Sequence, residues 1–206
     1  MEMNVKEFDV IAREVFAPAY GAFARQIKEA TGITEGSCLD VGAGGGQLGI
    51  ALAGITDLDI RLLDQSREML DVAERNIIAA GLGKKIGTMQ ADVHDIPCGD
   101  RSVNCIVSRG SVFFWEDLPT AFREIYRVLA PGGATFIGGG FGSTAIRKSV
   151  DEKMAARRKD WIDTRKKRLG PGTMDRFHAA LTQAGVPYEI RQVEAGFGIM
   201  IRRDAS

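Results

Sequence analysis

The chain has 206 residues, of which 45% are hydrophobic and 26% charged, and its 27 basic residues balance its 27 acidic ones. This length suits one globular domain with a sizeable core, and the neutral charge gives no bulk electrostatic reason to expect nucleic acid or a membrane as a partner. Charges at positions 6, 7, 9, 13 and 14 interrupt any apolar signal-peptide core, and no apolar run is long enough to span a bilayer, so we expect a cytoplasmic protein.

The N-terminal segment is predicted to form two short helices. Its apolar residues recur at helical spacing between Phe8 and Phe23, and Pro18 favours a break between the helices. After residue 36 the pattern changes to alternating strands and helices. We expect strands at 37–41, 59–64, 87–91, 103–108 and 134–138, with helices at 47–54, from 66 to a stop at Gly81, and at 118–129. This alternation predicts a parallel sheet with helices on both faces.

The C-terminal third begins with a strongly charged segment. Residues 151–169 hold eight basic and four acidic residues on a thin apolar stripe, which predicts an exposed helix or a mobile cover. A helix at 174–184 and two strands at 188–193 and 197–202 are expected to follow. The turn between these strands is too short for a crossover helix, so the strands are predicted to pair as an antiparallel hairpin.

The three cysteines are predicted to be neither bridged nor metal-bound. Cys38, Cys98 and Cys105 are odd in number, widely spaced and form no C-x-x-C motif. We therefore expect them to pack as small apolar residues, and we predict no metal site.

A glycine-rich turn, CLDVGAGGGQLGIALA at 38–53, joins the first predicted strand to a helix. Glycines let backbone approach a ligand closely, which favours a nucleoside cofactor, although the G-x-G-x-x-G pattern of Gly44, Gly46 and Gly49 is a weak signal alone. Asp40 ends the strand just before the turn. A carboxylate there would repel a pyrophosphate but attract the sulfonium and ammonium groups of S-adenosylmethionine.

Carboxylates also end the next two predicted strands. Asp64 follows the second strand, where an acidic residue can accept both ribose hydroxyls, and Asp92 follows the third. Because parallel strands end at one edge of a sheet, where ligands of such folds bind, we expect Asp40, Asp64 and Asp92 to lie at one site.

Five segments in order carry a resemblance to a known family. They are DVGAGGG at 40–46, LLDQSREML at 62–70, ADVHDIP at 91–97, CIVSRGSVFFW at 105–115 and RVLAPGG at 127–133. In these motifs the chain resembles a class I S-adenosylmethionine-dependent methyltransferase of the small-molecule type, over roughly residues 36–142. The resemblance implies a Rossmann-like, doubly wound α/β fold with seven strands in the order 3-2-1-4-5-7-6, the last strand being antiparallel.

The same resemblance implies which residues hold the methionyl end and the ribose of the cofactor. Asp40 and the turn residues Gly42, Ala43 and Gly44 would hold the methionyl end, and Asp64 the ribose.

Four further residues are implied at the adenine. Gln65 and Met69 would surround it, Asp92 would accept its amino group, and Val93 would contact its ring. His94 lies beside this presumed pocket, and we interpret it as a hydrogen-bonded loop residue rather than a general base.

Three residues are implied near the transferred methyl group. Ser108 and Arg109 would line the floor beneath it, and Tyr20 is similar to N-terminal tyrosines that close over the cofactor. Arg109 has three other interpretations: a ligand of an anionic substrate, a ligand of the cofactor carboxylate, or the partner of a nearby acid. The run GGGFG at 138–142 allows close backbone approach near the acceptor, or forms a plain flexible turn.

We therefore interpret residues 1–206 as one methyltransferase domain. Its parts would be an N-terminal helical lid (1–35), a cofactor-binding core (36–142), a helical substrate-side segment (143–187) and a β-hairpin (188–206). The expected reaction is methyl transfer from S-adenosylmethionine to a small molecule by in-line displacement, with no catalytic residue assigned. The alternatives are methylation of RNA or protein, a non-enzymatic S-adenosylmethionine-binding protein and, more remotely, a nicotinamide dehydrogenase.

Overall fold

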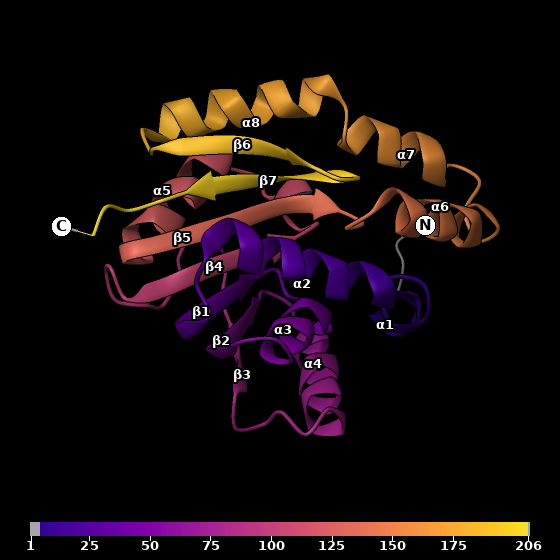
Figure 1. Cartoon of the computed structure of the whole chain (residues 1–206), viewed down its shortest axis with the longest axis horizontal. Coiled ribbons are helices and arrows are strands. Elements are labelled where there is room, and N and C mark those ends of the chain that lie inside the picture. The colour runs from indigo at the N-terminus through magenta and orange to yellow at the C-terminus, as the bar shows by residue number, and fades with distance from the viewer. Residues whose placement is uncertain (1–4, 206) are drawn as a thin grey trace.

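One seven-stranded sheet organises the computed structural model, which describes residues 5–205 (Figure 1). Its strands lie in the order β3-β2-β1-β4-β5-β7-β6, as the resemblance predicted. The strands are β1 (Glu35–Val41), β2 (Asp57–Asp64), β3 (Ile86–Gln90), β4 (Val103–Arg109), β5 (Leu129–Gly140), β6 (Tyr188–Val193) and β7 (Gly196–Ile201). All neighbours pair in parallel except that β7 is antiparallel to both β5 and β6, which confirms the predicted hairpin.

Eight α-helices and one 3₁₀ turn connect these strands within residues 5–205. They are α1 (Val5–Glu14), α2 (Ala17–Thr31), α3 (Gln47–Ala53), α4 (Arg67–Ala79), η1 (Val112–Phe114), α5 (Leu118–Val128), α6 (Thr144–Ala155), α7 (Trp161–Arg168) and α8 (Pro171–Ala184). None of the helices in this range is both long enough and apolar enough to span a bilayer.

Two helices show how local sequence signals predicted where they begin or end. The hydroxyl of Ser66 accepts a hydrogen bond from the Met69 backbone N–H at 3.2 Å, which caps α4, and Gly81 follows the helix with a left-handed φ of 69°. Pro18 lies in the first turn of α2, where its missing N–H has no helical partner to lose. The helix break therefore falls just before Pro18, at the start of α2.

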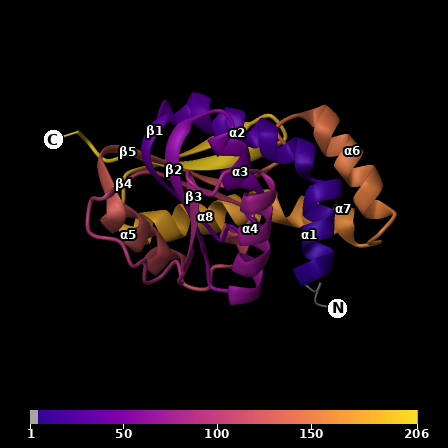
Figure 2. The same cartoon turned by 90° about the horizontal axis from the view of Figure 1, so that it is seen from below.

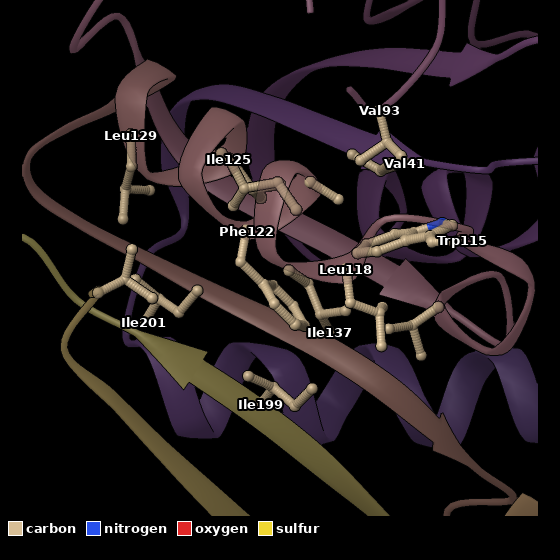
Figure 3. Packing of buried hydrophobic residues seen from close by; sticks show 14 of the residues in the cluster. Val41, Val93, Trp115, Leu118, Phe122, Ile125, Leu129, Ile137, Ile199 and Ile201 are labelled. Atoms are coloured by element: carbon tan, nitrogen blue, oxygen red, sulfur yellow. The ribbon is translucent and has the colours of Figure 1, made fainter. Parts of the chain in front are cut away.

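The sheet buries a separate hydrophobic cluster on each face. Helices α2, α3 and α4 cover one face, where Phe23, Leu52 and Ala73 pack against the strands. Helices α5 and α8 cover the other, and Figure 3 shows Phe122 and Ile125 of α5 against the sheet residues. Side chains alternate along each strand, so neighbouring residues of β1 contribute to opposite clusters.

A third, smaller cluster lies beyond the carboxyl end of β5. It contains Ile11 of α1, Val15 directly after this helix, Phe141, and Val150 and Met154 of α6. Figures 1 and 2 show α1, α6 and α7 gathered at this end of the molecule. The segment predicted as one exposed helix or a mobile cover is thus two helices, and α6 already begins at Thr144, with the Ser143 hydroxyl as its cap.

Candidate functional site

Two adjoining cavities lie at the carboxyl ends of the parallel strands. Their volumes are about 620 and 410 Å³. Five residues line both of them: Gly42, Asp64, Gln65, Ser111 and Phe114. The cavities therefore form adjacent parts of one site, in the place where ligands of doubly wound sheets bind.

The glycine turn lies where the two cavities meet: Gly42 lines both of them, and Gly44 lines the larger one. Gly42 and Gly44 have left-handed φ values of 66° and 53°, and the N–H of Gly42 donates to the carbonyl of Leu63 at 2.8 Å. A Cβ on Gly42 would come within 2.3 Å of the Ser111 side chain, so this position has no room for one. The turn thus presents bare backbone to the site for both conformational and packing reasons.

Asp64 joins the end of β2 to this turn. One carboxylate oxygen accepts the Gly44 N–H at 2.8 Å and the other accepts the Ser66 N–H at 2.9 Å. The residue is partly exposed and lines both cavities. Each oxygen keeps a free lone pair, so the fixed carboxylate can accept two further hydrogen bonds, as adjacent ribose hydroxyls would require.

Asp40 differs from the expectation that it faces a ligand at the mouth of the turn. Its residue is only 1% exposed, its carboxylate accepts the Gly49 N–H at 3.1 Å near the start of α3, and it lines neither cavity. Burial raises the pKa of Asp40 to about 7, partly offset by the Gly49 hydrogen bond, and nearby Asp64 raises it further. Asp40 thus binds the backbone near the start of α3 and does not itself line the site.

The smaller cavity is lined by three of the four residues predicted at the adenine, Gln65, Asp92 and Val93, whereas Met69 lines the larger cavity. Val41, Val93 and Trp115 line it with apolar surface and lie together in Figure 3. Asp92 also lines it and accepts hydrogen bonds from the backbone N–H of His94 at 2.9 Å and from the His94 ring at 2.5 Å. These bonds, the backbone one first, lower the pKa of Asp92, so it presents an ionised acceptor beside these apolar side chains.

His94 is held at both ring nitrogens. Its Nδ1 contacts Asp92 at 2.5 Å and its Nε2 lies 3.1 Å from the carbonyl oxygen of Asp117. Both ring nitrogens therefore have a partner within the protein. The structure therefore agrees with the interpretation of His94 as a hydrogen-bonded loop residue.

Arg109 and Tyr20 lie together in the larger cavity. The Arg109 guanidinium lies 4.7 Å from the Tyr20 ring centroid, and its Nε and Nη2 donate to the carbonyl of Gly140 at 3.0 and 2.7 Å. Burial lowers the pKa of Arg109 and raises that of Tyr20, although the neighbouring guanidinium opposes the rise. Within residues 5–205 no carboxylate lies within ion-pair distance of Arg109, so the reading as a partner of a nearby acid is wrong.

Known proteins match both the sequence and this geometry. A family model described as a methyltransferase domain matches residues 39–137. The crystal structure of a candidate S-adenosyl-L-methionine-dependent methyltransferase from Methanococcus maripaludis is 43% identical, covers 100% of this chain and 98% of its own, and has a TM-score of 0.95. The chain belongs to the S-adenosylmethionine-dependent methyltransferase family.

More distant relatives share the fold or part of the sequence. A methyltransferase structure from Aquifex aeolicus is 18% identical, with a TM-score of 0.65 over 97% of this chain and 98% of its own. The curated ubiquinone/menaquinone biosynthesis C-methyltransferase UbiE of Geotalea daltonii is 30% identical over 105 residues, which are 50% of this chain and 45% of that protein. The chain spans less than half of the length of the curated relatives it matches.

The residues of this methyltransferase site fit S-adenosylmethionine. The turn at Gly42 is a backbone cradle that a Cβ would fill, Asp64 offers paired acceptors between the cavities, and Asp92 lines the smaller cavity together with Val93 and Trp115. This donor and acceptor set suits a cationic nucleoside, and among residues 5–205 no cluster of basic groups lies at the turn to hold a diphosphate.

Most, but not all, of the site residues predicted from the sequence line one of the two cavities. Tyr20, Gly42, Gly44, Asp64, Gln65, Met69 and Arg109 line the larger cavity, and Asp92 and Val93 line the smaller one. Asp40, Ala43 and Ser108 line neither. Ser108 is fully buried and contacts the Ser111 hydroxyl at 2.5 Å, so it supports a lining residue instead of being one.

The glycine run 138–140 is an ordered part of β5 and no flexible turn. A Cβ on Gly138 would lie 2.1 Å from the carbonyl oxygen of Phe197 in β7, and one on Gly139 would lie 3.0 Å from the Phe113 ring. Gly139 and Phe113 both line the larger cavity. The glycine run therefore lets β7 and the Phe113 ring pack closely against β5 at the site.

Several lining residues were not predicted from the sequence. Ser111 is one, because only the fold brings it against Gly42. Trp161, Arg165 and Arg168 of α7 are others, since their helix has no fully buried residue and so no clear apolar stripe. The charged segment 151–169 gave the available signal, as a possible cover.

Proposed function

We propose that this methyltransferase transfers a methyl group from S-adenosylmethionine to a small-molecule acceptor. The observation that carries the proposal is the continuity of the site. The glycine turn and Asp64 border both cavities. The larger cavity extends from them to the rings of Phe113 and Phe141 and to helices α6 and α7. A cavity of about 620 Å³ has the size usual for a small-molecule site.

The relatives support the same acceptor class. UbiE of Geotalea daltonii is named as a C-methyltransferase of quinone biosynthesis, and Chlorobaculum tepidum has a demethylmenaquinone methyltransferase that is 31% identical over 110 residues. By contrast, the basic segment 151–169 is the part of the chain that an RNA substrate would be expected to contact, and three of its basic residues are paired with acids: Arg157 with Glu14, Arg158 with Asp160 and Arg165 with Asp151. This pairing favours a small molecule over RNA.

The cofactor roles are proposed residue by residue. The backbone from Gly42 to Gly44, including Ala43, would hold the methionyl end, and the buried charge of Asp40 would favour its ammonium and sulfonium groups. Asp64 would accept the ribose hydroxyls.

The remaining roles concern the adenine and the methyl group. Asp92 would accept the adenine amino group, with Val93 against the ring and Gln65 and Met69 around it. Arg109, held over Tyr20, would close the floor of the site near the methyl group and the cofactor carboxylate, and Ser108 would hold Ser111 in place there.

S-adenosylmethionine supplies the reactive methyl carbon, and the chain positions the acceptor behind it. Alignment of two reactants is worth about 7–11 kcal/mol, which is the main contribution asked of this site. The aromatic residues Phe113 and Phe141, with α6 and α7 above them, would exclude water. No side chain is assigned as a general base, because an acceptor that is ionised at neutral pH needs none.

The domain assignment is part of the proposal. Helices α1 and α2 would act as the lid, with residues up to 142 as the cofactor core, 143–187 as the acceptor side and the C-terminal hairpin completing the sheet. Residues 1–4 and 206, which belong to the first and last of these parts, lie outside the described residues.

Methyl-labelled S-adenosylmethionine incubated with the protein and a cell extract tests this function. We expect label in the small-molecule fraction and none above background in RNA or protein. Label confined to RNA or protein would overturn the acceptor class, and cofactor binding with no transfer to any fraction would favour a non-enzymatic protein.

A further inference from the structure

The acceptor side of the larger cavity carries an excess of positive charge. Three arginines from α7 or the turn before it line this side (Arg158, Arg165 and Arg168), and Arg109 lines the cofactor end of the same cavity. Within residues 5–205, the carboxylate that lines the cavity is Asp64, also at the cofactor end. The chain as a whole is neutral, so this concentration of one sign of charge is local.

Arg168 is the arginine of this group that is left without an acid on the acceptor side. Arg165 binds Asp151 at 2.8 Å and Arg158 binds Asp160 at 2.9 Å. For Arg168, no carboxylate of residues 5–205 lies within ion-pair distance. Burial lowers the pKa of Arg168, and repulsion from Arg158 lowers it further. A half-buried cation with a like-charged neighbour is costly unless an anion joins it.

The contacts of Arg168 leave it able to bind such an anion. Its guanidinium carbon lies 4.7 Å from the ring centroid of Phe114 and 5.9 Å from that of Phe113. Stacking on an aromatic face uses the flat side of the guanidinium and leaves its N–H edge free. That edge matches the two oxygens of one carboxylate.

The carboxylate of the cofactor has a different arginine available. Arg109 lies over Tyr20 and ends β4, which pairs with β1, the strand that leads into the glycine turn. The pair therefore lies on the side of the proposed methionyl end. The electrostatic neighbour of Arg168 is instead Arg158, on the α6–α7 side. Arg168 is therefore free for the second substrate.

We propose that the methyl acceptor is an apolar or aromatic molecule with a carboxylate, and that Arg168 binds this carboxylate. The apolar body lies among Phe113, Phe141, Met154, Trp161 and Leu169, which line the same cavity. This inference rests on the proposed function and narrows its substrate class. Arg168 is a positioning residue for the acceptor, since it holds a group remote from the transferred methyl.

Three aromatic probes that differ in charge test the proposal. Protein saturated with S-adenosylhomocysteine is titrated by calorimetry with 2-naphthoate, with the neutral 2-naphthamide and with 2-naphthyl phosphate. We expect 2-naphthoate to bind at least about tenfold more tightly than the amide, as a charge-assisted bidentate pair implies, and more tightly than the phosphate.

Variants assign the preference to one side chain. Arg168→Met should lose the preference for the carboxylate over the amide, and Arg168→Lys should keep part of it because the charge remains. Lys166→Met removes the same charge from an exposed position on the same helix, outside the cavity, and should keep the full preference. Circular dichroism of each variant verifies that the fold is retained.

The outcomes separate this proposal from the proposed function. Equal binding of carboxylate and amide, tighter binding of the phosphate, no binding of any probe, or an unchanged preference in both Arg168 variants would overturn the carboxylate acceptor. Weakened S-adenosylhomocysteine binding in Arg168→Met would assign Arg168 to the cofactor and overturn it as well. Absence of S-adenosylhomocysteine binding by the unaltered protein would contradict the proposed function itself.

Discussion

The carboxylate of Asp64 accepts the backbone N–H of Gly44 at 2.8 Å, which ties the end of β2 to the glycine turn after β1. One side chain thus orders the turn and offers acceptors to both cavities. Any change at Asp64 should therefore affect cofactor affinity more than it affects the rest of the fold.

Asp64→Asn should weaken S-adenosylhomocysteine binding by roughly tenfold or more, because the amide cannot accept at both ends as the carboxylate does. Asp59→Asn is the matched control, an exposed acid on the same strand. Its affinity should equal that of the unaltered protein. Equal affinities for all three proteins would show that Asp64 does not bind the cofactor.

Gly42→Ala should reduce both stability and cofactor binding. The new Cβ meets Ser111 at 2.3 Å, and a φ of 66° costs a side chain about 1–2 kcal/mol in addition. Gly81→Ala separates the two effects, since its φ is 69° but nothing lies within 4 Å of its Cβ. Chemical denaturation and calorimetry should show a small stability loss with normal affinity for Gly81→Ala, and larger losses of both for Gly42→Ala. Similar behaviour of the two variants would contradict the packing argument.

Asp40 should make the stability of the ligand-free protein fall as the pH rises. Its folded-state pKa is raised from an ordinary 3.8 to about 7, so between these values the folded protein keeps a proton that the unfolded chain releases. Its stabilising contribution is complete below about pH 4 and is lost as the pH rises through 7. The loss is on the order of 2–4 kcal/mol.

Denaturation of the unaltered protein and Asp40→Asn at pH 5 and pH 8 isolates this contribution. The difference in unfolding free energy between the two proteins should shift in favour of the variant at the higher pH. Asp59→Asn should show no such shift. A pH-independent difference between Asp40→Asn and the unaltered protein would contradict the raised pKa.

Phe114→Ser should weaken cofactor binding with little change in stability. Phe114 is 66% exposed, so its removal costs the folded core little, yet it lines both cavities. Ile78→Ser is the control, because Ile78 is 76% exposed on α4 and lines neither cavity. Thermal melts with and without S-adenosylhomocysteine should show a reduced ligand-induced shift for Phe114→Ser alone.

Much of the fold was predictable because local signals agreed with the global pattern. The Ser66 cap, the left-handed Gly81 and the short turn after Val193 each marked an element end that the structure confirms. Strand ends were less sharp. β5 was predicted at 134–138 but begins at Leu129, because Leu129 pairs with Val103 across an irregularity in register that no sequence pattern shows.

The position of the site at the strand ends was predictable from the sequence, but the direction of the Asp40 side chain was predicted wrongly. Asp40 precedes the glycine turn, but side chains alternate along β1, and Asp40 shares its face with Cys38, which packs toward α2 and α3. This alternation was available in the sequence and argues against a ligand-facing Asp40. The placement of α7 beside the larger cavity was not predictable from the sequence, because this helix has no fully buried residue and its position depends on tertiary contacts.

Calorimetric titration of the purified protein with S-adenosylmethionine, S-adenosylhomocysteine and NAD tests the central claim most directly. The site described here predicts one equivalent of either sulfur nucleoside bound per chain, and no heat from NAD. Absence of binding by both sulfur nucleosides, or binding of NAD with comparable affinity, would contradict it.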